Sequence, residues 1–201
     1  MQPFIRAYRP TDLDAIYDIC VRTAASGGDA RGRHTSDRML GDVWAVPYVT
    51  REPEYAHVLD DGTGAAVGYI LGTADTVAFV KWFRDEWIPE KAGTFAADDP
   101  RDRELAAVFG SPEKMVRPEF ADYPAHLHID LLPEWQGRGR GRALMAAFLA
   151  GLRAAGVERV HLGMAAENTG AYAFYRRLGF HDIAVPDAGA RFVGRDTSPP
   201  E

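Results

Sequence analysis

The stretch from Leu127 to Leu152 changes its hydrophobic period midway, and this limits what it can fold into. Apolar residues alternate with other side chains from Leu127 to Leu131, as expected for a strand. From Ala143 onward apolar residues recur three and four positions apart, which is typical of a helix with one buried face. Residues 136–142 lie between them and carry glycine at every second position. The pattern predicts a strand, a tight glycine turn and a helix.

A turn of this kind in front of a helix is suited to bind an anion. The first amide groups of a helix have no partner inside the helix, and the helix dipole favours negative charge there. Arg138, Arg140 and Arg142 add positive charge, so we expect a phosphate or pyrophosphate at the turn. The sequence departs from the Rossmann and Walker fingerprints. A purely structural loop with solvated arginines remains an alternative on this motif alone.

Composition limits the class of protein. The 201 residues, 46 % of them hydrophobic, suit one domain, which we place at 1–195 with a disordered tail at 196–201. A formal net charge of −6 argues against a nucleic-acid partner and is compatible with a cationic substrate. The apolar runs are too short to span a membrane, and the N-terminus lacks the apolar stretch of a signal peptide. Cys20 is the single cysteine, which favours the cytoplasm, and we expect it to be buried in the first helix.

Periodicity along the rest of the chain predicts a mixed sheet with helices on both faces, an α/β fold. A capping box of Thr11 and Asp14 should begin the first helix. A helical excursion occupies about 76–122. Further strands are expected at 4–8, 55–59, 65–73, 159–164, 180–183 and 191–195, and helices at 13–21, 38–48, 76–88, 101–109 and 170–178.

A second motif follows the strand at 159–164 and favours a functional interpretation of the glycine turn. It reads Asn168-x-x-Ala171-x-x-x-Tyr175-x-x-x-Gly179-Phe180. Together with Gln136-x-x-Gly139-x-Gly141, it resembles the paired signatures of the GNAT N-acetyltransferase superfamily, and the resemblance covers residues 127–183. It implies an α/β (α+β) fold with a mixed, mostly antiparallel sheet of six to seven strands. Two parallel central strands should splay apart, with helices on both faces.

The resemblance also implies acetyl-CoA as cofactor, with CoA as product. Its pantetheine arm should lie between the splayed strands and its pyrophosphate on the amides of the turn. A bulge in the strand before the turn should free main-chain N–H groups for the thioester carbonyl. Tyr175 matches the acid that protonates the leaving thiolate. The implied cofactor-binding residues are Leu131, Leu132, Gln136, Gly137, Arg138, Gly139, Arg140, Gly141, Arg142, Asn168 and Tyr175.

The base that deprotonates the acceptor amine is harder to choose from sequence. Asp130 is the first candidate, because it points away from the apolar residues of its strand. His126 and His128 share that face and could relay a proton. Glu134 and Asp75 are further candidates, Glu134 being expected in solvent and Asp75 near the pocket. No metal-binding pattern is present in the sequence.

The N-terminal half carries a second resemblance. Tyr8-Arg9-Pro10, Pro53-Glu54-Tyr55, Gly68-Tyr69 and Trp87-Ile88-Pro89 are similar to landmarks of the C-terminal acetyltransferase-like domain of animal O-GlcNAcases. That domain lacks the full glycine-turn signature and is suspected of being a pseudo-acetyltransferase, whereas this chain has the signature. Hydrolysis of O-GlcNAc is not implied, since no glycosidase domain is present. The aromatic residues Trp82, Phe83 and Trp87 either line an acceptor pocket or pack in the core.

These observations predict an acetyl-CoA-dependent N-acetyltransferase that acts by direct transfer to a primary amine of a small molecule or peptide. Acceptor specificity should lie in residues 29–54 and 76–124, and a homodimer is possible. The alternative is a catalytically silent acyl-CoA-binding or protein-interaction module. A dinucleotide-binding oxidoreductase is a third hypothesis.

Overall fold

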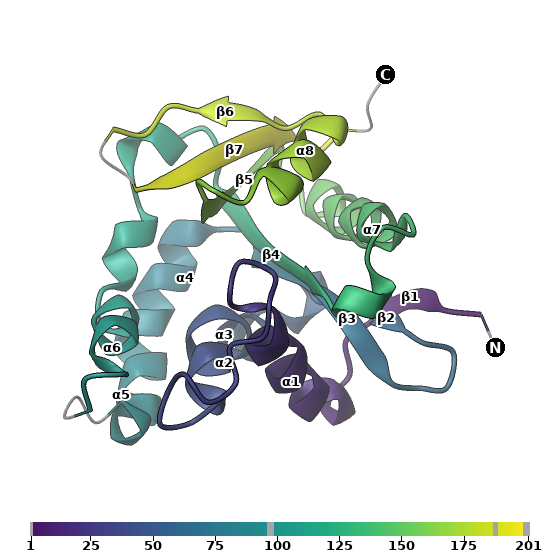
Figure 1. Cartoon of the computed structure of the whole chain (residues 1–201). Coiled ribbons are helices and arrows are strands. Elements are labelled where there is room, and N and C mark those ends of the chain that lie inside the picture. The colour runs from purple at the N-terminus through teal and green to yellow at the C-terminus, as the bar shows by residue number, and fades with distance from the viewer. Residues whose placement is uncertain (1, 96–98, 187–188, 199–201) are drawn as a thin grey trace.

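The computed structural model describes residues 2–95, 99–186 and 189–198 and is built around one seven-stranded sheet (Figure 1). The strand order is β1-β2-β3-β4-β5-β7-β6. This confirms the predicted mixed sheet of six to seven strands. The strands are β1 (Phe4–Ala7), β2 (His57–Asp60), β3 (Ala66–Thr73), β4 (Ala125–Leu131), β5 (Arg159–Ala165), β6 (His181–Ile183) and β7 (Ala190–Asp196).

The central strands β4 and β5 are parallel and touch at one end only. Their pairing is Ala125 with Val160 and His126 with His161. On its other side, β4 pairs with β3 in an antiparallel ladder from Leu131 to His126. Strand β5 pairs with β7 along its whole length. Each central strand is therefore paired along its outer edge, while the inner edges diverge, which confirms the splayed pair.

Helices cover both faces of the sheet (Figure 1). One core cluster joins the early helices to Tyr69 and Leu71, and the other joins the later helices to Ile70 and Leu127. Because side chains alternate along a strand, these two sets lie on opposite faces. The first face carries α1 (Leu13–Thr23), α2 (Arg38–Trp44), α3 (Val46–Arg51) and α4 (Thr76–Trp82), and the second carries α7 (Arg140–Ala154) and α8 (Thr169–Arg177).

The predicted excursion at 76–122 is helical and breaks into short pieces. After α4 come a π-helical turn (Phe83–Trp87), α5 (Ile88–Lys91) and α6 (Arg103–Phe109). Short 3-10 turns span Pro10–Asp12, Pro53–Tyr55, Ala92–Thr94, Pro112–Met115, Pro118–Phe120 and Pro133–Trp135. Five of these six turns begin with proline, whose fixed φ suits a first helical position and whose missing N–H is not needed there.

The structure corrects two local predictions. The helix expected at 38–48 is two helices, separated at Ala45, and Pro47 lies in the first turn of α3. The Thr11–Asp14 capping box does not form, because Asp12 instead accepts the Arg9 N–H at 2.8 Å and pairs with Arg6. The tail expected at 196–201 lies partly outside the described residues. Thr197 donates its N–H to Glu158 at 2.8 Å and is buried, while residues 199–201 lie outside the described part of the chain.

Gly72 of β3 allows the close approach of the β4 main chain and of Phe148 on α7. A Cβ at this position would lie 2.3 Å from the His126 carbonyl oxygen and 2.6 Å from Phe148 Cζ. We expect Gly72→Ala to lower the free energy of unfolding by about 1–3 kcal/mol, as overpacking in a core does. Urea unfolding of the variant measures this.

Gly93→Ala is the matched control, because a Cβ there would meet nothing within 4 Å and Gly93 has no positive φ. An equal effect of the two substitutions would show that steric exclusion at Gly72 is not the cause.

Candidate active site

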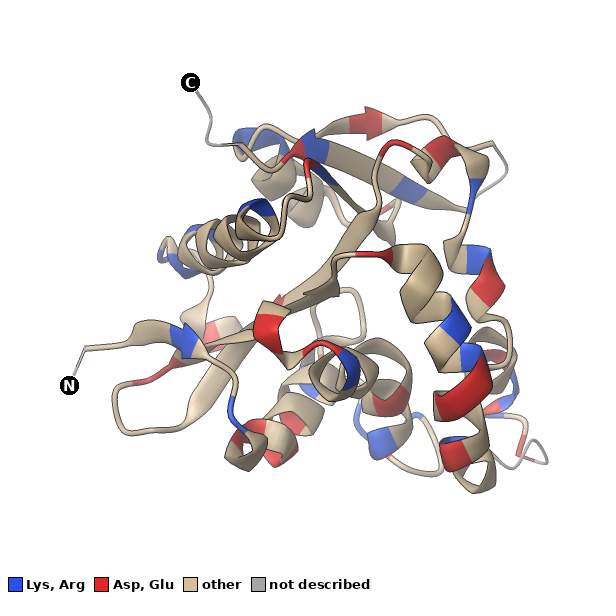
Figure 2. Cartoon of the chain, turned by 180° about the vertical axis from the view of Figure 1, so that it is seen from behind, with Lys and Arg blue, Asp and Glu red and all other residues tan. Residues whose placement is uncertain are grey.

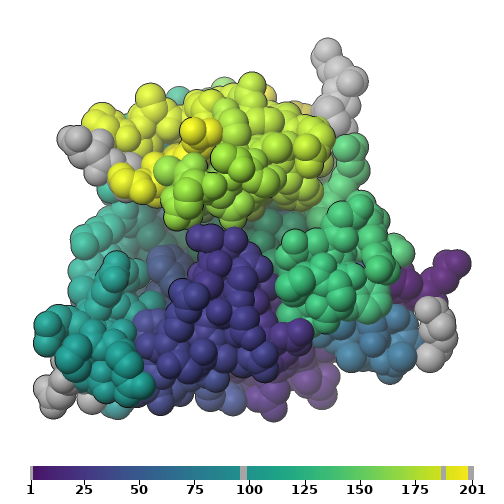
Figure 3. Space-filling view, viewed as in Figure 1, coloured from purple at the N-terminus to yellow at the C-terminus, as the bar shows by residue number. Residues whose placement is uncertain are grey.

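A cleft of about 930 Å³ opens where β4 and β5 diverge. In Figure 3 it is the hollow beneath the yellow-green surface of α8. Its walls come from β4, β5, α8, the glycine turn and the segment that follows α1. That last segment, with Ala24, Ser26 and Gly27, carries no motif that sequence reasoning could have singled out.

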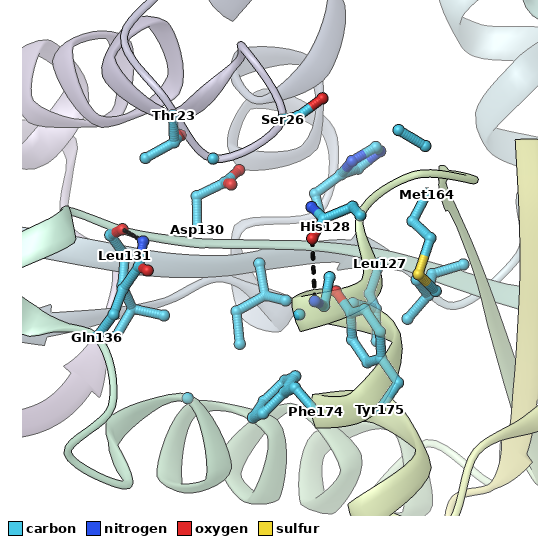
Figure 4. Close-up of a pocket in the computed structure, with 18 of the residues that line it drawn as sticks. Thr23, Ser26, Leu127, His128, Asp130, Leu131, Gln136, Met164, Phe174 and Tyr175 are labelled. Atoms are coloured by element: carbon cyan, nitrogen blue, oxygen red, sulfur yellow. Dashed lines mark hydrogen bonds between the residues drawn. The ribbon is translucent and has the colours of Figure 1, made fainter.

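The glycine turn forms one end of this cleft. Gly137 and Gly139 have φ of +71° and +73°, a conformation that L side chains rarely adopt. Gly139 is the N-cap of α7, a helix of 15 residues, so the free amides of its first turn lie beside the cleft. Gly141 lies against α8, since a Cβ there would be 3.0 Å from Phe174 Cζ. Gln136 donates to the Leu131 carbonyl at 2.8 Å, which fixes the turn to the end of β4 (Figure 4).

Divergence of the strands, and not a bulge, exposes the main chain of β4. The pairing between β3 and β4 runs without a register shift from Gly68–Leu131 to Thr73–His126, so the predicted bulge is wrong. Leu132 donates its N–H to Val67 at 3.1 Å, on the β3 side. Main-chain groups alternate in an antiparallel ladder, so those of Ile129 and Leu131 face the gap toward β5. In the described part of the chain, β5 pairs with β4 only at residues 125 and 126.

Three of the predicted cofactor-binding residues do not line the cleft. Leu132 is buried and its N–H is already bonded, so it is not accessible to a ligand. Arg138 does not line the cleft, and the Arg140 side chain turns toward β1, where it donates to Pro3 at 3.4 Å. The lining residues among those predicted are Leu131, Gln136, Gly137, Gly139, Gly141, Arg142, Asn168 and Tyr175.

Helix α8 brings Asn168 and Tyr175 to the cleft. The Asn168 Oδ1 accepts the Ala171 N–H at 3.0 Å and caps the helix. The Tyr175 ring packs against Phe174 and Phe180 with 7 % of its surface exposed. Burial, with a smaller contribution from the Asp130 carboxylate, raises the pKa of Tyr175. At neutral pH its hydroxyl is therefore protonated and can donate.

Asp130 lies on the opposite side of β4 from Tyr175. Figure 4 shows its carboxyl directed toward Thr23 and Ser26, with Phe174 and Tyr175 across the cleft. The Tyr69 hydroxyl donates to Asp130 Oδ2 at 2.8 Å. Burial raises the pKa of Asp130, and this hydrogen bond opposes the rise. A carboxylate with a raised pKa is a stronger base than one in water.

The histidines on this face form one hydrogen-bonded chain whose tautomers can be deduced. Thr76 donates its hydroxyl proton to the Pro124 carbonyl at 2.8 Å, so it must accept from His126 Nδ1, also at 2.8 Å. The Nε2 of a neutral His126 then accepts from the Tyr48 hydroxyl at 2.8 Å.

The Tyr48 oxygen, in turn, accepts from His128 Nε2 at 3.1 Å. The remaining lone pair of His128 is therefore on Nδ1. His128 lines the cleft, and no hydrogen bond of its Nδ1 is found within the described residues. Burial lowers the pKa of His128 to about 4 and that of His126 well below its usual range, so both rings are neutral at pH 7.

Other candidates from the sequence lie elsewhere. Asp75 caps α4 by accepting the Val77 and Ala78 N–H groups, which corrects its placement near the pocket. Glu134 is exposed, as expected, and pairs loosely with Arg22 at 3.6 Å. Cys20 is 3 % exposed and buried in α1, also as expected.

The aromatic set of the excursion divides between core and cavity. Trp82 and Trp87 are core residues, and Trp87 Nε1 donates to the Asp42 carbonyl at 2.9 Å. Phe83 lines a second cavity, of about 420 Å³, next to the cleft. Much of that cavity is walled by the segment 108–120, which the sequence left without a motif.

Within 2–95, 99–186 and 189–198, no three acidic, histidine or cysteine side chains gather closely enough to hold a metal ion. None of the helices in those same ranges has the length and apolar character needed to cross a bilayer.

The deduced tautomers predict how the two histidines titrate. By ¹⁵N NMR at pH 7, we expect the proton of His126 on Nδ1 and that of His128 on Nε2, with His128 protonating only near pH 4. Since the unfolded histidine titrates near 6.5, stability should fall as pH is lowered from about 6.5 toward 4. A pKa of His128 near 6.5 in the folded protein would refute the deduced chain of hydrogen bonds.

Comparison with known proteins agrees with this geometry. A sequence model described as "Acetyltransferase (GNAT) domain" matches residues 94–182. The crystal structure of SsHAT is 53 % identical in sequence, with a TM-score of 0.94 over 98 % of this chain and 100 % of that chain. The structure of yncA from Salmonella typhimurium with its cofactor acetyl-CoA has a TM-score of 0.58 at 17 % identity, over 98 % of this chain and 95 % of that one, and shows the same fold.

Among curated proteins, Protein O-GlcNAcase of Rattus norvegicus is 27 % identical over 186 residues. The match covers 90 % of this chain and 20 % of the relative, so the chain spans about a fifth of that protein's length. This confirms the second resemblance noted in the sequence. The splayed strands, the glycine turn, the family match and the full-length similarity to SsHAT agree, and the chain belongs to the GNAT acetyltransferase family.

Proposed function

We propose that this protein is an acetyl-CoA-dependent N-acetyltransferase that transfers the acetyl group directly to a primary amine of a small molecule or peptide. The observation that supports this most is the single cleft that combines the open inner edge of β4 with the glycine turn at the start of α7. An extended thioester with a diphosphate needs both features, at opposite ends of one groove.

The residues present fit such a ligand. The amides of the α7 first turn and the Arg142 side chain would hold the diphosphate. Asn168 lies at the cleft wall, where it would meet the pantetheine arm. The Leu131 and Ile129 main-chain groups face the gap, where an N–H would polarise the thioester carbonyl. The structure of yncA, which has the same fold, was determined with its cofactor acetyl-CoA.

The side chains supply two proton transfers for the reaction. Asp130, on the α1 side, accepts a proton from the amine, whose nitrogen forms a bond to the acetyl carbon while the carbon–sulfur bond breaks. Tyr175, on the α8 side, donates its hydroxyl proton to the departing thiolate. The two groups line the same cleft from opposite sides, so one bound thioester can meet both.

The competing hypothesis is a module that binds acyl-CoA without turnover. Binding of acetyl-CoA in a calorimeter, with no CoA thiol released across a broad amine panel, would favour it. Gln136, Gly139, Gly141 and Tyr175 all line the cleft, which favours the enzyme. A fluorescence titration with NAD(P)H tests the dinucleotide-binding alternative.

Tyr175→Phe should separate the two hypotheses. It removes only the hydroxyl, so we expect unchanged acetyl-CoA affinity and a fall in kcat of about 10²–10⁴-fold, the usual contribution of a positioned acid. Stopped assays of CoA release give the rate, and calorimetry gives the affinity.

Tyr172→Phe is the matched control on the same helix, because the Tyr172 hydroxyl bonds to Asp182 at 2.8 Å and does not line the cleft. A Tyr175→Phe enzyme with wild-type kcat would rule out the assigned acid.

Asp130 should govern the acidic limb of the pH profile. Because a base must be unprotonated, kcat/KM should rise with pH through the raised pKa of Asp130. We expect Asp130→Asn to lower kcat/KM by about 10²-fold or more and to abolish that limb. The exposed Glu134 gives the control, Glu134→Gln, which should leave the profile unchanged. Retention of the limb in Asp130→Asn would assign it to another group.

A further inference from the structure

The second cavity meets the cleft at the place where β4 and β5 part. The wall that this cavity does not share with the cleft is mostly apolar and aromatic, and it includes Val43, Phe83, Met115, Phe120 and Phe192. At about 420 Å³ it is large enough for a small molecule. The residues that line both spaces are Trp44, Leu127, His128, Leu162, Gly163, Met164 and Ala165.

The charged side chains that line this cavity in the described ranges are positive. Lys114 and Arg117 are its cationic lining residues, and no aspartate or glutamate lines it within the described ranges. The Arg117 Nε is buried without a hydrogen-bond partner among those residues. Glu113, the acidic neighbour in sequence, is held outside the cavity by Arg84, with Nε and Oε1 2.6 Å apart.

The three histidines that line the cavity add no charge at neutral pH. His126, His128 and His161 line the cavity, and burial lowers the pKa of each of the three. His161 is held by the Tyr123 carbonyl at 2.9 Å from Nδ1 and by a stacked Phe120 ring. His128 presents the Nδ1 lone pair deduced above, which can accept a hydrogen bond from an amine at the junction with the cleft.

We infer that this cavity is the acceptor subsite and that it selects a small primary amine whose apolar, ring-bearing body carries a carboxylate. The inference rests on the proposed function. The amine lies at the His128 junction beside the cleft, the ring lies between the aromatic walls, and the carboxylate pairs with Arg117 and Lys114. An acceptor with a second cation, such as a diamine, places that charge against two cations in an apolar cavity.

This local charge differs from that of the whole chain. The net charge of −6 is compatible with a cationic substrate, and Figure 2 shows acidic and basic residues distributed over the helices around the sheet. Selection at a site depends on the groups that face it, because exposed charges farther than about 10 Å are screened by salt.

Three acceptors of one shape test the inference. They are 4-(aminomethyl)benzoate, benzylamine and 4-(aminomethyl)benzylamine, which share the ring and the reacting amine and differ in the charge at the far end. With saturating acetyl-CoA, kcat/KM from CoA release should be at least about 10-fold higher for the carboxylate than for benzylamine, since a hydrogen bond to a charged group contributes at least that factor. The diamine should be the poorest.

The variant Lys114→Gln/Arg117→Gln should reduce the ratio of the carboxylate to benzylamine toward one. Lys81→Gln is the control, since Lys81 is 79 % exposed and lies outside the cavity. Circular dichroism melting verifies that each variant folds. Equal or better use of the diamine, or an unchanged ratio in the double variant, would overturn the inference while leaving the acetyltransferase intact.

Binding is scored separately by ligand-observed NMR with the same three amines and no acetyl-CoA. If neither these three amines nor the broad amine panel releases CoA, the proposed function fails, yet tighter binding of the carboxylate that Lys114→Gln/Arg117→Gln abolishes would still support the subsite. Absence of that preference in both experiments would overturn the subsite.

Discussion

The hydrogen-bond pairing of β4 and β5 at one end only is the constraint on which the candidate site depends. Each of these strands has a complete partner on its outer edge, β3 for β4 and β7 for β5, so the sheet does not need their inner edges to be stable. Unpaired main-chain groups are costly when buried without a partner. Here they face a cleft, where solvent or a ligand can satisfy them, and the gap thereby becomes a binding groove.

The period-two geometry of β4 then divides the site into two chemical halves. Leu127, Ile129 and Leu131 face α7 and α8 and form part of the apolar core. Asp130 and His128 face the α1 side, where Tyr69 and Tyr48 hold them through hydrogen bonds. One strand thus supplies an apolar wall toward Tyr175 and a polar wall toward the α1 segment. The opposed proton donor and acceptor of the proposed reaction follow from this alternation.

His126 and His128 belong to a hydrogen-bonded chain in which the donor and acceptor of each bond are fixed. It ends at a main-chain carbonyl, that of Pro124, which can only accept, so every proton along the chain is placed by the one before it. A ring fixed in this way stays neutral and presents a lone pair at a defined place. The second cavity shares His128 with the cleft, and its two cationic residues, Lys114 and Arg117, lie on a segment that precedes both GNAT motifs in sequence.

The sequence by itself determined the strand, the glycine turn, the helix and their family, because those features are local. Glycine at 137 and 139 and the 3.6-residue period of α7 can be read from neighbouring residues, and they are where the structure has them. Asp130 and Tyr175 could be named for the same reason, as single positions of a strand and a helix.

Only the tertiary structure decided what those residues meet. The sequence predicted a bulge in β4, whereas the exposed main chain results from the separation of two strands, a relation between residues more than thirty positions apart. Arg140 bonding to Pro3, and residues 108–120 forming the wall of the second cavity, are likewise long-range contacts. Periodicity reports which face of an element is buried and carries no information on which distant element covers it.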